Sequence, residues 1–141
     1  GFKALIPDLN STDESLRALV ALTLGSAMQN NVKVQIAAVE SNVLDPLLRI
    51  ISMDTSVTVK SRAVYAVSCL IRQFPFAQKM FLKQGGLSVL ASIFKENNLI
   101  VDKLKVKIIN LLHDILVEQK QALEEQNENK DRYEHPLDSA S

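Results

Sequence analysis

The chain has 141 residues, 47% of them apolar, which is enough for one domain with a buried core. Its 16 Lys and Arg balance its 16 Asp and Glu, so it lacks the dense basic stripe that nucleic-acid binding requires. No stretch approaches the roughly 20 consecutive apolar residues of a membrane span, and the single cysteine, Cys69, cannot form an internal disulfide.

The first predicted elements are the end of one helical unit. Residues 2–9 resemble second helices that recur further along the chain. Hydroxyl and carboxylate side chains at 11–14 supply N-caps for a helix that reaches about Gln29. Because the chain starts abruptly within this unit, we expect it to be a piece of a longer protein whose targeting signals lie outside it.

From this point the pattern repeats after about 43 residues. Each copy contains two short helices and one longer helix, separated by a break at Asn42 or Gly85 and by a polar loop. The predicted helices are 34–40, 44–51 and 58–72 in the first copy, and 77–83, 87–94 and 101–119 in the second. Three helices per forty-odd residues is the armadillo period. We therefore predict an all-α, right-handed armadillo solenoid with two full repeats and part of a preceding one.

The end of the chain differs in composition from the rest. Residues 1–120, the predicted armadillo fragment, hold 14 Lys and Arg and 10 Asp and Glu, whereas residues 121–141 hold two and six. This acidic tail has few large apolar groups, so we predict a helix extension of a turn or more and then disorder towards Pro136. Because solenoids need about three repeats for stability, we expect the fragment to be marginal or to shield its open end by self-association. Leu24, Val67, Leu70, Leu112 and Ile115 are the predicted core.

The sequence predicts no catalytic, cofactor or metal site. Cys69 and His113 form a conceivable nucleophilic pair, but a thiol packed between helices is the favoured reading. One cysteine and two histidines do not supply the convergent ligands of a metal centre. For Lys103, Lys105 and Lys107, a solvated helix face is favoured over contact with an acidic partner.

Solenoid repeats present extended surfaces to their partners, so we look for function on the third helices, which line the groove of armadillo proteins. Armadillo repeats commonly carry a Trp and, four residues later, an Asn on this row. Their places are taken by Leu22 with Ser26, Tyr65 with Cys69, and Asn110 with Asp114, with Arg62 beside Tyr65. This departure removes the ladder that clamps extended peptides and favours docking of a folded domain, with an exposed Tyr65 as the aromatic anchor.

The segment Phe74-Pro75-Phe76-Ala77-Gln78-Lys79-Met80-Phe81-Leu82-Lys83-Gln84-Gly85-Gly86-Leu87-Ser88-Val89-Leu90 carries a resemblance to a known family. With Leu9-Asn10-Ser11-Thr12 and Lys33-Val34-Gln35, it resembles the armadillo-type nucleotide exchange factors of BiP, the 70-kDa heat-shock chaperone of the endoplasmic reticulum. It is similar, less closely, to cytosolic Hsp-binding-protein relatives. The resemblance covers residues 2–120.

This resemblance implies a co-chaperone of the endoplasmic-reticulum lumen that supports protein folding and translocation. Such a protein binds the second lobe of the BiP nucleotide-binding domain, opens the cleft and lets ADP leave. Asn10-Ser11-Thr12 is an N-glycosylation sequon in a predicted polar loop, which agrees with that address. The alternative is a general armadillo adaptor that binds an extended peptide or a cytosolic 70-kDa chaperone.

Overall fold

The computed structural model describes residues 1–134, and these fold into helices without any strand. The prediction of an all-α protein is confirmed for this part of the chain, whereas the disorder predicted towards Pro136 lies outside the described residues. The elements are α1 (Phe2–Leu5), η1 (Ile6–Asn10), α2 (Glu14–Met28), α3 (Val32–Glu40), α4 (Leu44–Met53), α5 (Val57–Ile71), α6 (Pro75–Lys83), α7 (Gly86–Ser92), η2 (Ile93–Lys95) and α8 (Leu99–Glu134).

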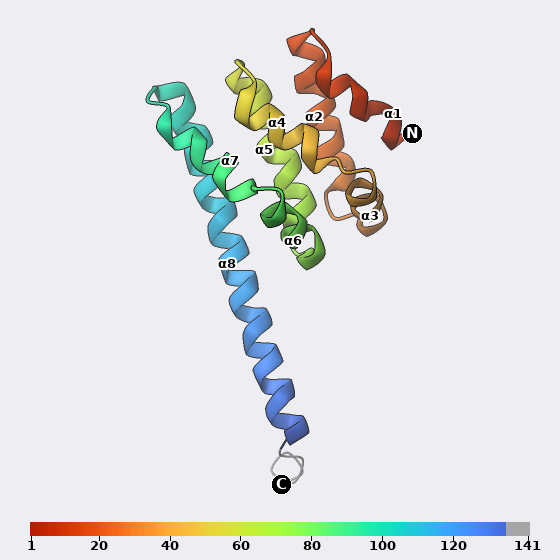
Figure 1. Cartoon of the computed structure of the whole chain (residues 1–141), viewed down its shortest axis with the longest axis vertical. Helices are drawn as coiled ribbons and strands as arrows, with labels where there is room; N and C mark the ends of the chain where they lie inside the picture. Colours follow the sequence, from red (N-terminus) through yellow and green to blue (C-terminus); the bar gives the residue numbers. More distant parts are fainter. Residues whose placement is uncertain (135–141) are drawn as a thin grey trace.

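The longer helices form a row in chain order (Figure 1). α2 packs against α5, and α5 packs against α8. The shorter α4 and α7 contact each other and follow the same order, so that each successive three-helix unit is laid against the one before it (Figure 1).

The backbone confirms the 43-residue period. Asn30 and Gln73, which follow α2 and α5, both have left-handed backbones with φ of 54° and 57°. Asn42 and Gly85, which follow α3 and α6, have φ of 52° and 79°. Residues other than glycine rarely adopt this backbone conformation, and asparagine does so more readily than most. Asn42 therefore ends its helix in the way that Gly85 ends the corresponding helix one unit later, as the sequence predicts.

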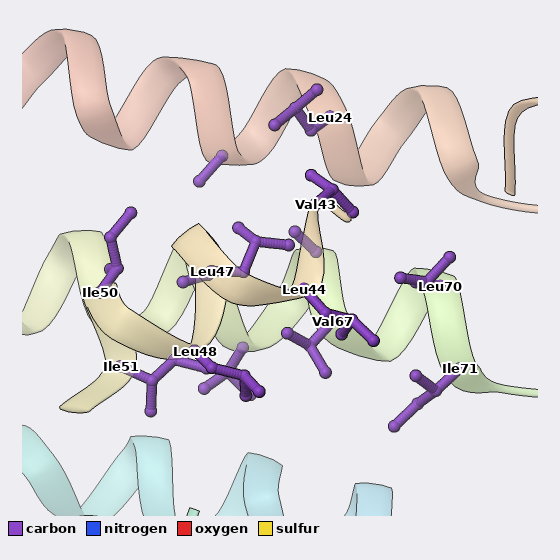
Figure 2. Close-up of a cluster of buried hydrophobic side chains, with 14 of the residues drawn as sticks. Leu24, Val43, Leu44, Leu47, Leu48, Ile50, Ile51, Val67, Leu70 and Ile71 are labelled. Carbon is purple, nitrogen blue, oxygen red and sulfur yellow. The ribbon is translucent and has the colours of Figure 1, made fainter. Parts of the chain in front are cut away.

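The hydrophobic core lies where α4 packs on α5, which itself packs directly against α2 (Figure 2). Leu47 of α4 points into the space between Leu24 of α2 and Val67 of α5, and all three are fully buried. Leu70, also predicted as core, is likewise fully buried. The apolar residues of α4 recur at helical spacing and therefore form one stripe, which is buried.

The prediction for the last helix is only partly right. Leu112 and Ile115 of α8 are half-buried and pack against the edge of the core instead of lying within it. The fully buried positions of α8 come earlier in the helix, at Val101, Leu104, Ile108 and Leu111. The difference arises because no further unit covers the far side of α8 in the described structure.

The extension predicted for the last helix, by a turn or more, is confirmed. α8 continues without a break across residue 120 and reaches Glu134, for a length of 36 residues. Every residue from Gln119 to Tyr133 is exposed. This segment stays helical because it contains no Gly or Pro and is rich in Glu, Gln and Lys, which favour helix even without a packed face.

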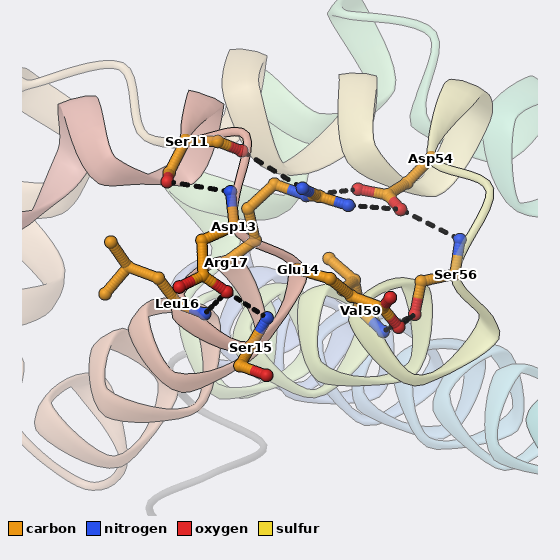
Figure 3. A network of polar contacts seen from close by, with 9 residues as sticks. All are labelled: Ser11, Asp13, Glu14, Ser15, Leu16, Arg17, Asp54, Ser56 and Val59. Carbon is orange, nitrogen blue, oxygen red and sulfur yellow. Dashed lines mark hydrogen bonds and ion pairs between the residues drawn. The ribbon is translucent and has the colours of Figure 1, made fainter.

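A polar cluster joins the start of α2 to the end of α4 (Figure 3). The Arg17 guanidinium donates to the Asp54 carboxylate from Nε at 2.8 Å and from Nη2 at 3.2 Å, and from Nη1 to the Ser11 carbonyl oxygen at 3.0 Å. The Ser56 backbone N–H also donates to Asp54, at 2.9 Å. This bidentate pair is almost removed from solvent, with side-chain exposures of 16% for Arg17 and 6% for Asp54.

The ion pair recurs one unit later. Lys60, 43 residues after Arg17, is buried and contacts Glu96 at 3.0 Å in the loop before α8. In both units a cation near the start of a longer helix binds a carboxylate that follows the second short helix of the next unit. The repeated pairs thus tie each unit to its neighbour at the same place.

Burial of the Asp54 carboxyl by itself raises its pKa, because a charged group is disfavoured away from water. The hydrogen bonds from Arg17 and from the Ser56 backbone, together with the Arg17 charge, outweigh this effect, so the pKa of Asp54 lies below its ordinary value. A depressed pKa stabilises the fold above the unfolded value of about 3.9, and that contribution is lost as pH falls through the folded value.

We therefore expect Asp54→Asn to be less stable than the parent chain at neutral pH, because Arg17 loses its charged partner. The difference in free energy of unfolding should narrow as the pH falls below about 4, where Asp54 itself becomes protonated. Urea denaturation at a series of pH values measures both quantities. A difference that stays constant from neutral to acidic pH would contradict the assigned direction of the pKa shift.

Leu70→Ala should lower the free energy of unfolding by about 2–5 kcal/mol, because a fully buried leucine leaves a cavity when truncated. Leu123→Ala is the matched control, since Leu123 is exposed and its truncation should cost less than about 0.5 kcal/mol. Urea unfolding followed by circular dichroism compares the two. Equal losses for both variants would show that the α5 core face is misplaced.

Candidate partner-binding surface

The surface of interest runs along α2, α5 and α8, and the predicted residues lie there with different exposures. Tyr65, Cys69, Leu22 and Asp114 are half-buried, whereas Ser26, Arg62 and Asn110 are exposed. Ser26 Oγ lies 3.5 Å from the Tyr65 hydroxyl, and Tyr65 and Asn110 line the same hollow. The described structure shows no such link for Leu22 or Arg62.

Tyr65 is less free than the sequence predicts. Its ring from α5 lies on Gly25 of α2, so closely that a Cβ at position 25 would stand 2.5 Å from Tyr65 Cε2. The Tyr65 hydroxyl donates to Gln29 Oε1 at 3.3 Å and lies 3.5 Å from Ser26 Oγ. The expectation of an exposed ring is therefore wrong: the ring is half-buried and fixed in place by α2.

A small hollow of about 200 Å³ opens between α5 and α8 beside Tyr65. Asn110 lies on its α8 side, so the structure brings together two of the predicted residues. Its lining consists of Val64, Tyr65, Ser68, Arg72, Lys107 and Asn110. The hollow therefore combines one aromatic ring with two cations.

The two cations are held by neighbouring side chains. Arg72 Nη2 contacts the Asp114 carboxylate at 3.1 Å. Asp114, one of the predicted surface residues, is thus paired with a residue at the end of α5. Among the described residues, Arg72 Nε is buried without a hydrogen-bond partner. Lys107 Nζ donates to Ser61 Oγ at 3.1 Å. Arg72 thus lines the hollow with a guanidinium that is paired with Asp114 and whose Nε is buried.

Arg72 is not among the predicted surface residues, yet it lines the hollow. Arg72 follows Tyr65 by seven residues, which is two helical turns along one face, and this spacing could have found it. Lys107 is exposed, as a solvated helix face predicts, and it also lines the hollow. Lys105 instead contacts Asp102 at 3.6 Å on its own helix.

Cys69 has the properties of a packed thiol. Burial raises its pKa, so the thiol stays protonated at neutral pH and is a poor nucleophile. Its carbonyl oxygen accepts a hydrogen bond from Gln35 Nε2 of α3 at 3.0 Å, which anchors the end of α5. His113 is exposed and lies 3.7 Å from the Asp114 carboxylate. These environments favour the structural reading of Cys69.

Among residues 1–134, no three His, Cys, Asp or Glu side chains converge as a metal ligand set. Over the same range, no helix has both the length and the hydropathy that crossing a membrane requires. The sequon residue Asn10 is exposed at the end of η1, at the turn that leads into α2.

The comparisons with known proteins agree on one family. Residues 1–137 match the model of the SIL1/FES1/HPBP1 C-terminal domain. Nucleotide exchange factor SIL1 of Xenopus laevis is 45% identical over 130 residues, which cover 92% of this chain and 28% of that protein. Its Rattus norvegicus counterpart is 38% identical over 125 residues, covering 89% and 26%.

A second group of relatives is more distant. Hsp70-binding protein 1 of Homo sapiens is 35% identical over 102 residues, which cover 72% of this chain and 28% of that protein. The chain spans a little over a quarter of the length of these curated relatives. Because the domain match extends over nearly all of the sequence, the chain belongs to the family of SIL1/FES1/HPBP1 C-terminal domains.

Proposed function

We propose that this chain is the chaperone-binding part of a nucleotide exchange factor for a 70-kDa heat-shock chaperone. In this proposal its three-helix units form a right-handed armadillo solenoid, and the row of α2, α5 and α8 is the concave side. The observation that carries it is the hollow beside Tyr65, which sits on the row of longer helices of a family whose relatives are named nucleotide exchange factors and Hsp70-binding proteins.

The role is that of a co-chaperone and not of an enzyme. A protein that binds one lobe of a two-lobed nucleotide-binding domain promotes ADP release if it has higher affinity for the open arrangement of the lobes. By linkage, ADP then weakens its binding by the same factor. No bond is made or broken by the exchange factor, so it needs a rigid docking surface and no catalytic group.

The chemistry of the surface favours a folded, acidic partner. Arg72 and Lys107 line the same hollow from two sides, so two cations face the space that a partner would enter. A carboxylate on the docked lobe that enters the hollow would lie beside both cations, and charge-assisted hydrogen bonds are stronger than neutral ones. The Tyr65 ring, held rigidly on Gly25, supplies the aromatic anchor that binding hot spots favour.

We further propose that the partner is BiP, at the second lobe of its nucleotide-binding domain, and that the protein works in the lumen of the endoplasmic reticulum. The SIL1 relatives, which match at higher identity than the Hsp70-binding proteins, support this choice. The exposed sequon at Asn10 supports a lumenal address.

Tyr65→Ala should weaken binding to the BiP nucleotide-binding domain by at least about 1 kcal/mol, a several-fold change in Kd, because it removes the aromatic anchor. ADP release should slow in step. Titration calorimetry with the ADP-loaded domain and release of a fluorescent ADP analogue measure the two effects. Both should be run well below the melting temperature, because the half-buried ring also contributes to stability.

Two controls separate binding from folding. Lys79→Ala on the exposed face of α6 should leave the affinity unchanged, and Leu70→Val should lower stability without changing the surface. Loss of binding with Lys79→Ala but not with Tyr65→Ala would move the interface to the other side. If neither variant matters and the intact parent protein binds no chaperone, the peptide-adaptor alternative becomes the better hypothesis.

The lumenal address predicts a glycan on Asn10. When the chain is expressed behind a secretory signal in eukaryotic cells, treatment with peptide-N-glycosidase should lower its apparent mass. Asn10→Gln and Thr12→Ala should each abolish the shift, whereas Ser11→Ala should not, because the middle position of the sequon is permissive. A chain that reaches the secretory pathway without any glycan would count against use of this site.

A further inference from the structure

Four large apolar side chains on the C-terminal side of the molecule are exposed, although their counterparts one unit earlier are buried. Because the units repeat, equivalent side chains differ in exposure only by whether a following unit covers them. The exposed side chains are Leu87 (51%), Phe94 (40%), Ile109 (53%) and Leu116 (66%), and their counterparts are Leu44 (1%), Ile51 (0%), Val64 (2%) and Ile71 (0%).

We name these four exposed residues the C-terminal edge. A cleft of about 360 Å³ opens beside it, lined mostly by apolar side chains that include Phe81, Leu87, Leu112 and Leu116. In the preceding unit, α7 and α8 cover the corresponding surface. The edge therefore has the composition of a buried contact, and such patches mark association surfaces.

Charge indicates what covers the edge. The exposed part of α8, residues 121–134, carries five carboxylates and two cations, whereas residues 1–120 carry 14 cations and 10 carboxylates. An isolated helix segment of this length is only marginally stable in water and gains from packing on another surface. The acidic half of α8 from one molecule thus complements the first half of α8 of another, residues 99–111, which carries three lysines and one aspartate.

The register of α8 makes this pairing self-complementary. Leu116 lies at the middle of the helix, and the residues seven positions away on either side are Ile109 and Leu123, both exposed. Seven further positions outward are Asp102 and Lys130. Seven residues are close to two turns, so these five positions share one helix face.

We propose that the C-terminal edge is the interface of a two-fold symmetric dimer of this chain, in which the two α8 helices pack antiparallel with Leu116 at the axis. Ile109 of one copy then lies opposite Leu123 of the other, and Asp102 opposite Lys130. An isologous interface requires such self-complementarity. In this register the middle of each α8 lies at the cleft of the other copy, and the exposed half of each α8 lies along the first half of the other α8.

Leu116→Glu tests the apolar centre of the interface. Sedimentation equilibrium over a concentration series should show a monomer–dimer equilibrium for the parent chain and at least a tenfold weaker one for the variant. Met53→Glu is the matched control, because Met53 is as exposed but lies on α4, away from the edge. Circular dichroism should show the same helix content for all three proteins.

A charge exchange tests the antiparallel register. Asp102→Lys and Lys130→Asp should each weaken the dimer several-fold, and the double variant should restore it. In a Cys69→Ser background, Leu116→Cys should form a disulfide-linked dimer under mild oxidation, because each residue faces its own copy. Met53→Cys should not cross-link.

Three outcomes overturn the proposal. The first is a parent chain that stays monomeric over the whole concentration series. The second is a dimer that resists Leu116→Glu or depends on Met53. The third is a full-length parent protein that is monomeric while this chain dimerises, because another segment of the parent would then cover the edge. None of these outcomes bears on chaperone binding, so this proposal and the proposed function fail independently.

Discussion

The structure depends on the burial of one helical unit against the next. The α4 helix shows this, because its leucines are buried where it packs on α5, beside α2 (Figure 2). Burial of side chains such as Leu24, Leu47 and Val67 supplies the main favourable free energy. Burial of apolar surface is non-directional, whereas the ion pair between Arg17 and Asp54 fixes the position at which one unit meets the next (Figure 3).

Much of this arrangement could be predicted because it rests on local patterns. The 43-residue period, the helix ends at Asn42 and Gly85, and the burial of Leu70 all follow from spacing and from the backbone preferences of single residues. The end of α8 could not be placed in the same way. Periodicity detects a packed face, and residues 121–134 are helical without one, so only their intrinsic helix propensity marks them.

The candidate surface was harder to predict, because it depends on contacts between helices. Spacing placed Tyr65 and Asn110 on one row, but the hollow between them also needs Arg72 and Lys107, which belong to different helices and approach only when the units stack. The same holds for the Tyr65 ring. Its exposure is decided by Gly25, a residue 40 positions earlier whose relevance no local pattern reveals.

Because the Tyr65 ring lies on Gly25, the size of residue 25 determines where this ring sits on the surface that a partner would meet. Any side chain there would occupy the place of the ring and push the phenol outward, away from Gln29 and Ser26. The residue that governs this contact lies on α2, whereas the group that it positions lies on α5. Substitutions on the two helices should therefore be energetically coupled, so that an enlarged residue 25 is tolerated only beside a smaller residue 65. The side chains that can be accepted at position 25 of α2 are therefore limited by the aromatic ring that α5 presents at the surface.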